Sequence, residues 1–314
     1  MPIITDTNIL NRWNSFYGAT KVNSFQYLNK AGISDIIRIN YLKTTDEILI
    51  PILEKKGFIL EKLSLPGAYK VQKQRISLGA SHEFLLGHYS IQGLASQFVS
   101  HIVNPSETDK ILDMSAAPGG KTAHLASIMK NKGLLIAVDS SKNRMTALRS
   151  NLSRLGVSNV LAFLGDAIDL SPKLGLFDKI LLDAPCSGSG SICKRPNKQW
   201  IKNESDIERL ASKQKNLLVT GLNQLKIGGE LIYSTCSLEP EEGEQQIISL
   251  MEEYEEKISI IGIEKHNNLF EPVDLQYPYS NMKIFSFLKE KWLRIIPNNN
   301  YEGFFICKIK KYKI

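Results

Sequence analysis

Short apolar strands alternate with helix-length segments from about residue 108 to residue 236, and this alternation limits the possible folds. Near-continuous apolar strands separated by helices indicate a mostly parallel sheet covered on both faces. The fold class is therefore α/β, and ligands of such sheets bind beyond the carboxyl ends of the strands. The expected strands are Lys110–Asp113, Leu134–Asp139, Val160–Leu164, Lys179–Asp183 and Glu230–Cys236. The expected helices are Lys121–Lys130, Lys142–Leu155 and Glu204–Lys226, the last closed by Gly228 and Gly229.

Residues 1–80 show a mixed pattern instead of this regular strand–helix alternation. They predict a small N-terminal α+β domain, followed by a larger domain over residues 81–314. Spaced apolar positions in residues 8–31 predict one or two helices. Further strands are expected at residues 36–40, 58–65 and 68–71, with a helix that Gly57 ends. A unit of this size suits an RNA-reading sheet and a plain scaffold equally well.

Composition narrows the class of protein further. Of 314 residues, 43% are hydrophobic and 23% are charged, which excludes disordered, collagenous and coiled-coil chains. Lysine and arginine number 39 against 32 acids, and the net charge of +7 favours a polyanionic partner. The four cysteines form no C-x-x-C pair and fit a reducing compartment. Because the chain shows neither a signal pattern nor an 18-residue apolar run, we expect a cytoplasmic protein without membrane contact.

A turn of small residues, from Asp113 to Thr122, follows the first strand of the predicted sheet. Gly119 and Gly120 open the next helix, whose free amides point toward any ligand at this edge. The turn is not a phosphate loop, because Ser115 stands where that pattern requires glycine. It also lacks the three spaced glycines of a dinucleotide site.

Acids end consecutive strands of the same sheet. Asp139 lies 19 residues after Gly120, at the place where a carboxylate typically accepts hydrogen bonds from ribose hydroxyls. Asp166 follows the third strand and can meet an exocyclic amine. Strand-end acids also serve as caps and turn formers. Together with the small-residue turn, however, they favour an adenosine-bearing ligand without a pyrophosphate, such as S-adenosylmethionine.

Two cysteines lie at the carboxyl ends of the last two predicted strands. Cys186 lies in a Pro/Ser/Gly-rich loop after the fourth strand, and Cys236 ends the fifth. A buried free cysteine is usually inert packing. Both of these, however, lie where neighbouring parallel strands end, which favours a function in the ligand crevice. Cys193 and Cys307 show no such setting, and we interpret them as packing residues.

These segments together resemble the Nol/Nop/Sun family of RNA cytosine-5 methyltransferases. The three motifs are Ala-Ala-Pro-Gly-Gly-Lys-Thr at 116–122, Asp-Ala-Pro-Cys-Ser-Gly at 183–188 and Ser-Thr-Cys-Ser at 234–237. Segments 79–92 and 302–306 are also similar to family elements. The compact N-terminal segment looks most like the archaeal tRNA members. The resemblance implies a Rossmann-like class I S-adenosylmethionine-dependent methyltransferase core with RNA, tRNA first, as substrate.

The resemblance also implies roles for individual residues. Cys236 matches the family's nucleophile, Cys186 the cysteine that helps to release product, and Asp183 the acid that bonds the target base. Lys121 matches a lysine found near that base. Many members have cysteine where this chain has Ser115, a nearly isosteric change. The implied methyl-donor residues are Ser115, Ala116, Ala117, Pro118, Gly119, Gly120, Lys121, Asp139, Arg144, Asp166 and Asp183.

Other functions remain open at this point. The same chemistry on rRNA is the first alternative. A non-catalytic RNA-binding or assembly factor is the second, although such a protein would be expected to have lost Cys236 or Asp183. A DNA cytosine methyltransferase would use Cys186 as its nucleophile. The loop from Lys194 to Lys202 joins four cations to Trp200 and suggests phosphate contact and base stacking, or an ordinary solvated loop. No metal constellation is evident, and we expect a monomer.

Overall fold

The computed structural model of the chain describes residues 7–171, 174–194, 200, 202–263, 270 and 276–313. Its contacts group the chain into two compact units. The first unit joins Met1–Ile33 to Leu182–Ile314, and the second is Ser34–Leu181. The domain boundary expected at residue 80 stays a prediction.

The second unit begins with a small antiparallel sheet in the strand order β2-β3-β1-β4. The predicted strand, helix and two strands are all present, and the fourth strand comes from a segment that was expected to lie outside this sheet. Leu49 and Leu53 pack the helix on the sheet's apolar face. The elements are β1 Ile36–Ile39, α3 Asp46–Lys55, β2 Ile59–Lys62, β3 Ala68–Lys73, η1 Leu78–Ala80, α4 His82–Leu85 and β4 Tyr89–Ile91.

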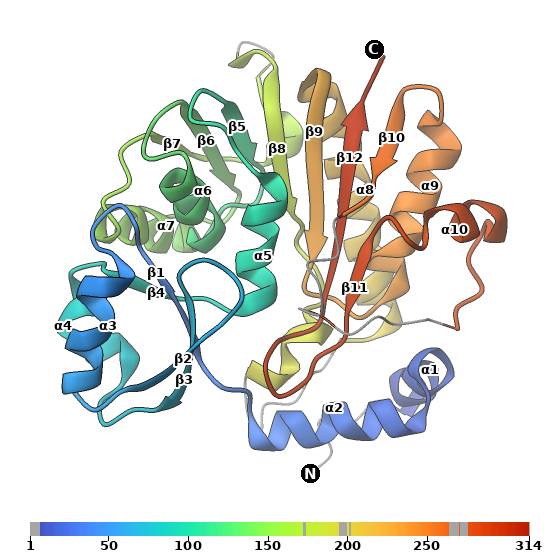
Figure 1. The fold of residues 1–314 in the computed structure, drawn as a ribbon. Coiled ribbons are helices and arrows are strands. Elements are labelled where there is room, and N and C mark those ends of the chain that lie inside the picture. The colour runs from blue at the N-terminus through green and yellow to red at the C-terminus, as the bar shows by residue number, and fades with distance from the viewer. Residues whose placement is uncertain are drawn as a thin grey trace. The chain divides into compact units, whose positions relative to one another are not determined.

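The rest of the second unit is the expected parallel βαβ arrangement, with strands in the order β8-β5-β6-β7 (Figure 1). Residues 135–139 of β6 are all buried, as expected for a strand covered on both faces. Ser141 caps α7 by accepting from the Arg144 amide at 3.4 Å. The elements are α5 Leu94–Val103, β5 Lys110–Asp113, α6 Gly120–Ile128, β6 Leu134–Asp139, α7 Lys142–Arg154, β7 Val160–Leu164, η2 Ala167–Asp169 and β8 Phe177–Asp183.

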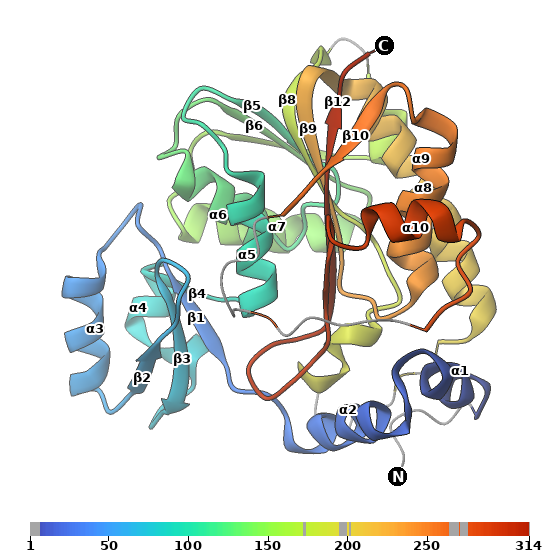
Figure 2. The same cartoon turned by 45° about the vertical axis from the view of Figure 1, so that its right-hand side comes forward.

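The first unit contains the carboxyl end of β8, then β9, and three C-terminal strands that are antiparallel to one another or to β9. Helices α8 and α9 contact each other and flank this part of the sheet (Figure 2). Residues 302–306, predicted as a family element, lead into β12, which pairs with β9. The elements are η4 Ser189–Lys194, α8 Glu204–Gln224, β9 Leu225–Thr235, η5 Pro240–Glu242, α9 Glu244–Tyr254, β10 Ile258–Ile261, α10 Met282–Leu288, β11 Leu293–Ile295 and β12 Phe304–Lys311.

The predicted end of α8 was wrong. The helix ends at Gln224, and Gly228 and Gly229 lie inside β9 rather than closing the helix. The Lys311 ammonium supplies the C-terminal cap instead, because it donates to the Leu222 and Leu225 carbonyls at 2.8 and 3.0 Å. A cation at the negative end of a helix dipole is favourable, and this one comes from a distant strand.

Two N-terminal helices, α1 Thr7–Tyr17 and α2 Ala19–Ala31, complete the first unit. The spaced apolar residues predicted for this segment form one face of a buried cluster. Trp13 lies at its centre, with its ring 6.2 Å from Phe25 and 5.7 Å from Trp200. The cluster also includes Ile192 and Leu238, which lie in segments that follow β8 and β9. The N-terminal helices therefore pack beneath the loops that carry the two predicted active-site cysteines.

Candidate active site

The first unit brings the two predicted cysteines together. Cys186 follows the end of β8 and Cys236 follows the end of β9, and their sulfur atoms lie 3.3 Å apart. The two strand ends are joined by a hydrogen bond of 2.8 Å from the Ala184 amide to the Ser234 carbonyl. Residues 50 positions apart thus form one dithiol, as the neighbouring strand ends predicted. Cys193 and Cys307, by contrast, are fully buried away from any such pair.

The surroundings of Cys186 favour its protonated form. Both thiols are partly exposed. The hydrogen bond with Cys236 raises the pKa of Cys186 well above that of a free thiol, and burial and the nearby charges of Glu242 and Asp183 act in the same direction. Either sulfur can donate in this contact, so Cys186 is placed to act on the sulfur of Cys236.

Asp183 lies at the end of β8, in the same unit as the thiols. Its Oδ1 atom accepts a hydrogen bond of 2.8 Å from the Ser234 hydroxyl, which holds the carboxylate against the end of β9. The residue is partly exposed, so the carboxylate is not sealed inside the protein. The geometry thus places an acid and two thiols at the same strand ends.

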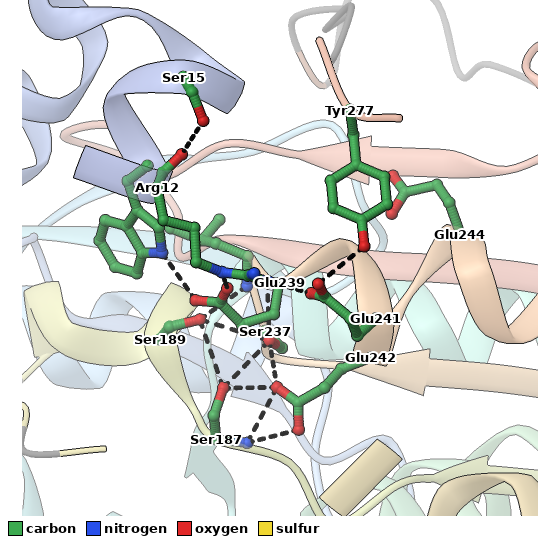
Figure 3. Close-up of polar contacts among 12 residues, drawn as sticks. Arg12, Ser15, Ser187, Ser189, Ser237, Glu239, Glu241, Glu242, Glu244 and Tyr277 are labelled. Atoms are coloured by element: carbon green, nitrogen blue, oxygen red, sulfur yellow. Dashed lines mark hydrogen bonds and ion pairs between the residues drawn. The ribbon is translucent and has the colours of Figure 1, made fainter. Parts of the chain in front are cut away.

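The site also contains a buried acid that the sequence pattern does not reveal. Glu242 is fully buried and accepts hydrogen bonds from Ser187 and Ser237, the residues that directly follow the two cysteines (Figure 3). Its Oε1 atom also accepts from the Gln214 amide at 3.1 Å. Burial raises the pKa of Glu242, against the effect of the hydrogen bonds from the two serines.

Two neighbouring acids connect the same loop to other elements. Glu239 accepts a hydrogen bond of 2.7 Å from the Trp13 indole and pairs with Arg12, which also bonds Glu241 (Figure 3). Glu244 pairs with the buried Arg294, whose guanidinium also donates to the Ser237 carbonyl. Helix α9 begins at Glu244, and a carboxylate there suits the positive end of the helix. The burial of these acids was not predicted, because only their distant partners reveal it.

Trp200 does not have the role suggested for it. The side chain is only 8% exposed and lies in the cluster around Trp13. Its indole nitrogen donates to the Ser187 carbonyl at 3.0 Å. A ring held in this way supports the Cys186 loop and is not available for stacking on a base. The cations Arg195 and Lys198 of the same segment lie outside the described residues.

The second unit contains the glycine-rich turn. Asp113, which is buried, accepts a hydrogen bond of 2.7 Å from the Thr122 hydroxyl and so closes the turn from Ser115 to Lys121. Gly119 adopts a φ of +97°, and a Cβ there would lie 2.8 Å from a Leu148 methyl group. At Gly120 a Cβ would meet only the Gln92 amide, at 3.8 Å. The first amides of α6 have no side-chain cap.

The predicted ligand-binding acids of the second unit also organise its backbone. Asp139 accepts from the Ala117 and Ser141 amides, both at 3.0 Å, and lies 3.5 Å from an Arg144 guanidinium nitrogen. Asp166 accepts from the Ile168 amide at 3.2 Å. Lys121 is partly exposed in the first turn of α6, within this unit. The roles predicted for these residues toward a ligand stay predictions.

The second unit supplies hydrogen-bond donors and acceptors that fit S-adenosylmethionine. Small residues such as Ala116 and Ala117 leave the backbone of the turn approachable, and the amides that begin α6 suit a carboxylate. Asp139 accepts one amide hydrogen bond at each oxygen and has Arg144 beside one of them, so a carboxylate with about four acceptor sites keeps capacity for a ribose hydroxyl.

The described residues contain no group of three histidine, cysteine or acidic side chains placed to hold a metal ion. No helix among them is long and apolar enough to cross a membrane.

Comparison with known proteins defines the class. A solved structure, a methyltransferase homologue from Pyrococcus horikoshii, is 32% identical and has a TM-score of 0.84, with 98% of this chain and 95% of that chain covered. The fold is therefore that of a methyltransferase. The family model for 16S rRNA methyltransferase RsmB/F matches residues 100–310. The chain belongs to this family, as the Nol/Nop/Sun resemblance predicted.

Named relatives act on different RNAs. The mouse 28S rRNA (cytosine-C(5))-methyltransferase is 33% identical over 97% of this chain and 38% of its own length. The tRNA (cytosine(72)-C(5))-methyltransferase of Pyrococcus horikoshii is 37% identical over 76% of this chain and 56% of its own. The chain therefore spans between about two fifths and three fifths of these relatives.

Proposed function

We propose that the chain is an S-adenosylmethionine-dependent RNA cytosine-5 methyltransferase. The observation that carries the proposal is the dithiol of Cys186 and Cys236, with sulfur atoms 3.3 Å apart at adjacent strand ends. Carbon 5 of cytosine is a poor nucleophile until a thiolate adds to carbon 6. A methyltransferase whose target atom is already nucleophilic needs neither thiol.

Cys236 begins the reaction. Its thiolate forms a bond to carbon 6, and the electron pair of the C5–C6 double bond is displaced into the ring. Asp183, held by Ser234, lies at the same strand ends and is assigned to bond the ring nitrogen 3 and the amino group. A hydrogen bond there would stabilise the negative charge that develops on the ring.

Methyl transfer and release follow. S-adenosylmethionine supplies the electrophilic methyl group, and carbon 5 is the nucleophile that accepts it. A base then removes the proton from carbon 5, its electron pair restores the C5–C6 double bond, and the Cys236 thiolate leaves carbon 6. We assign Cys186 to assist this last step, since its sulfur lies 3.3 Å from the sulfur that must leave.

The proposed methyl-donor site is the turn from Ser115 to Lys121 in the second unit, with Asp139, Arg144 and Asp166. The family resemblance also assigns Asp183 to the methyl donor and Lys121 to the target base. The target cytosine must be unpaired or flipped out of its stack, because a thiolate cannot reach carbon 6 inside a helix.

For the substrate we propose tRNA. The 37% identity to an archaeal tRNA enzyme supports this choice. Ribosomal RNA is the second candidate, and the family description and the mouse 28S rRNA enzyme support it.

The test is methyl transfer from labelled S-adenosylmethionine to unmodified total tRNA and rRNA, with bisulfite sequencing to locate the product. Wild type is expected to mark defined tRNA cytosines, and Cys236→Ala to lose about 10⁴-fold or more of the activity. Product on rRNA alone would overturn the tRNA proposal but keep the chemistry. Cofactor binding without product on either RNA would overturn the chemistry as well.

A further inference from the structure

Each cysteine of the dithiol is followed by a serine, and the two serines meet at one carboxylate. Ser187 donates to Glu242 from its hydroxyl and from its backbone amide, the amide at 2.9 Å. Ser237 donates to the same carboxylate, and the two serine oxygens lie 3.1 Å apart (Figure 3). One acid therefore bridges both cysteine loops at the residues that directly follow the cysteines.

The bridge is anchored to regular structure. Gln214 of α8 donates to Glu242 at 3.1 Å and to the Pro185 carbonyl, next to Cys186, at 2.9 Å. Tyr233 of β9 donates to the Gln214 side chain at 3.0 Å and to the Glu242 carbonyl at 2.7 Å. The carboxylate is thus held by a helix and a strand, which position a site more precisely than loops alone.

A buried carboxylate is costly unless hydrogen-bond donors surround it. The side-chain donors to Glu242 are Ser187, Ser237 and Gln214, and each of them fixes one of the two cysteine loops. Removing the charge therefore disturbs both loops together. Cys186 faces three acidic or thiol groups from neighbouring elements, namely Glu242, Asp183 and Cys236.

We propose that Glu242 is a positioning residue that holds the two cysteine loops in register and so sets the distance between the Cys186 and Cys236 sulfurs. Its consequence for catalysis rests on the proposed function: release of the RNA from Cys236 needs Cys186 close by. Glu242 itself touches no reacting atom.

Glu239 provides a matched control. Glu239 is also fully buried and lies three residues earlier. It accepts a hydrogen bond from Trp13 and forms an ion pair with Arg12. Its carboxylate partners, however, are Trp13 and Arg12 of α1 and not the serines that follow the cysteines. Glu239→Gln and Glu242→Gln therefore make the same substitution at similar burial, and only the second removes the acceptor that the two serines share.

The first experiment measures the thiol pair without RNA. Dibromobimane bridges two close thiols and becomes fluorescent, and the fully buried Cys193 and Cys307 are expected not to react. Wild type and Glu239→Gln should bridge rapidly, whereas Glu242→Gln should bridge about tenfold to a hundredfold more slowly, because a displacement near 1 Å has effects of this size. Labelling with iodoacetamide, which needs only one thiol, should change far less. Equal bridging rates in the two variants would overturn the proposal.

Ser237→Ala is the second variant, and it decides the question if Glu242→Gln does not fold. It removes one link of the bridge and keeps the charge. Slower bridging, with near-ultraviolet circular dichroism like that of wild type, is the expected result. Bridging at the wild-type rate would contradict the proposal.

The second experiment follows the reaction on RNA. Glu242→Gln should accumulate a covalent protein–RNA adduct that wild type and Glu239→Gln release, because misplacing Cys186 impairs release more than addition. A parallel loss of both steps would indicate a merely structural role and overturn the catalytic consequence. If wild type makes no 5-methylcytosine, the proposed function fails, while the bridging experiment still decides the role of Glu242.

Discussion

The glycine-rich turn and the cysteine loops both lie at strand ends, but they are held in different ways. The turn is closed by contacts between residues 9 to 27 positions apart, such as Asp113 with Thr122 and Arg144 with Ala117. The cysteine loops are held by buried acids whose partners lie up to 227 positions away, such as Glu239 with Arg12. The turn is held by contacts within one part of the sequence, whereas the cysteine loops are held by contacts between distant segments of the first unit.

This difference separates two ways of damaging the protein. A substitution in the turn should weaken the proposed methyl-donor site and leave the thiols intact. A substitution among the buried acids should disturb the thiol pair from a distance.

Cys186→Ala should convert a turnover enzyme into one that traps its RNA. Addition by Cys236 remains possible, but release loses its assisting thiol, so a covalent adduct stable in denaturing gels should accumulate. The rate of release should fall by about 10²–10⁴-fold, the usual contribution of proton transfer by a positioned side chain. The double variant Cys186→Ala/Cys236→Ala should form no adduct. Normal turnover by Cys186→Ala without an adduct would show that the role is wrongly assigned.

Arg294→Met should destabilise the first unit strongly. Arg294 is buried and pairs with Glu244 while donating to the Ser237 carbonyl, so its loss leaves a buried carboxylate unpaired. Breaking a buried pair in this way costs about 3–5 kcal/mol of unfolding free energy. Urea denaturation measures it. Lys308→Met, which removes a more exposed partner 3.0 Å from Glu230, is the control and should cost about 1 kcal/mol or less. Similar costs for the two variants would contradict the account.

Gly119→Ala should impair the turn and spare the dithiol. The residue has a φ of +97°, and its new Cβ would lie 2.8 Å from a Leu148 methyl group. Strain of this kind costs about 1–3 kcal/mol, and we expect about a tenfold loss of affinity for S-adenosylmethionine by calorimetry.

Gly228→Ala is the matched control for that change. Gly228 has a similar φ of +81°, but a Cβ there meets no atom within 4 Å, and the residue lies in β9. Its affinity for the methyl donor should equal that of wild type. Equal losses in both variants would show that the turn is not where the methyl donor binds.

The smallest effect concerns pH. Burial raises the pKa of Glu239 from 4.5 to about 7, and Arg12 and Trp13 only partly oppose it. The folded protein therefore binds this proton more tightly than the unfolded chain does. The contribution to stability is fully present below about pH 4.5 and is lost as the pH rises toward 7. Glu239→Gln should flatten this slope in urea denaturation measured between pH 5 and 7. An unchanged slope would assign the titration to another group.

Local patterns made the strands predictable. The residues at the ends of β5 and β6, the small-residue turn and the two cysteines each follow a short apolar run, so the sheet rules placed them correctly. The C-terminal end of α8 was predicted less accurately, because Lys311 and not a glycine caps this helix. Sequence alone places Arg12 and Trp13 in an amphipathic helix and does not reveal that they contact Glu239.

The buried acids were missed for a physical reason. Glu239, Glu242 and Glu244 look like a solvated helix start, because burial of a carboxylate depends on donors that folding brings from elsewhere. The one available signal was that a serine follows each cysteine, which suggests that the two loops share a partner. For Trp200 the sequence suggested an exposed ring that stacks on a base. The ring is instead buried, and its indole nitrogen donates to the Cys186 loop.

The central claim is that Cys236 forms the bond to RNA while Cys186 serves its release. The most direct measurement is mass spectrometry of the protease-digested and nuclease-digested adduct formed by Cys186→Ala with RNA and S-adenosylmethionine. The account predicts a methylated cytidine nucleotide attached to the peptide that contains Cys236. Attachment at any other residue, or no adduct while methyl transfer continues, would contradict it.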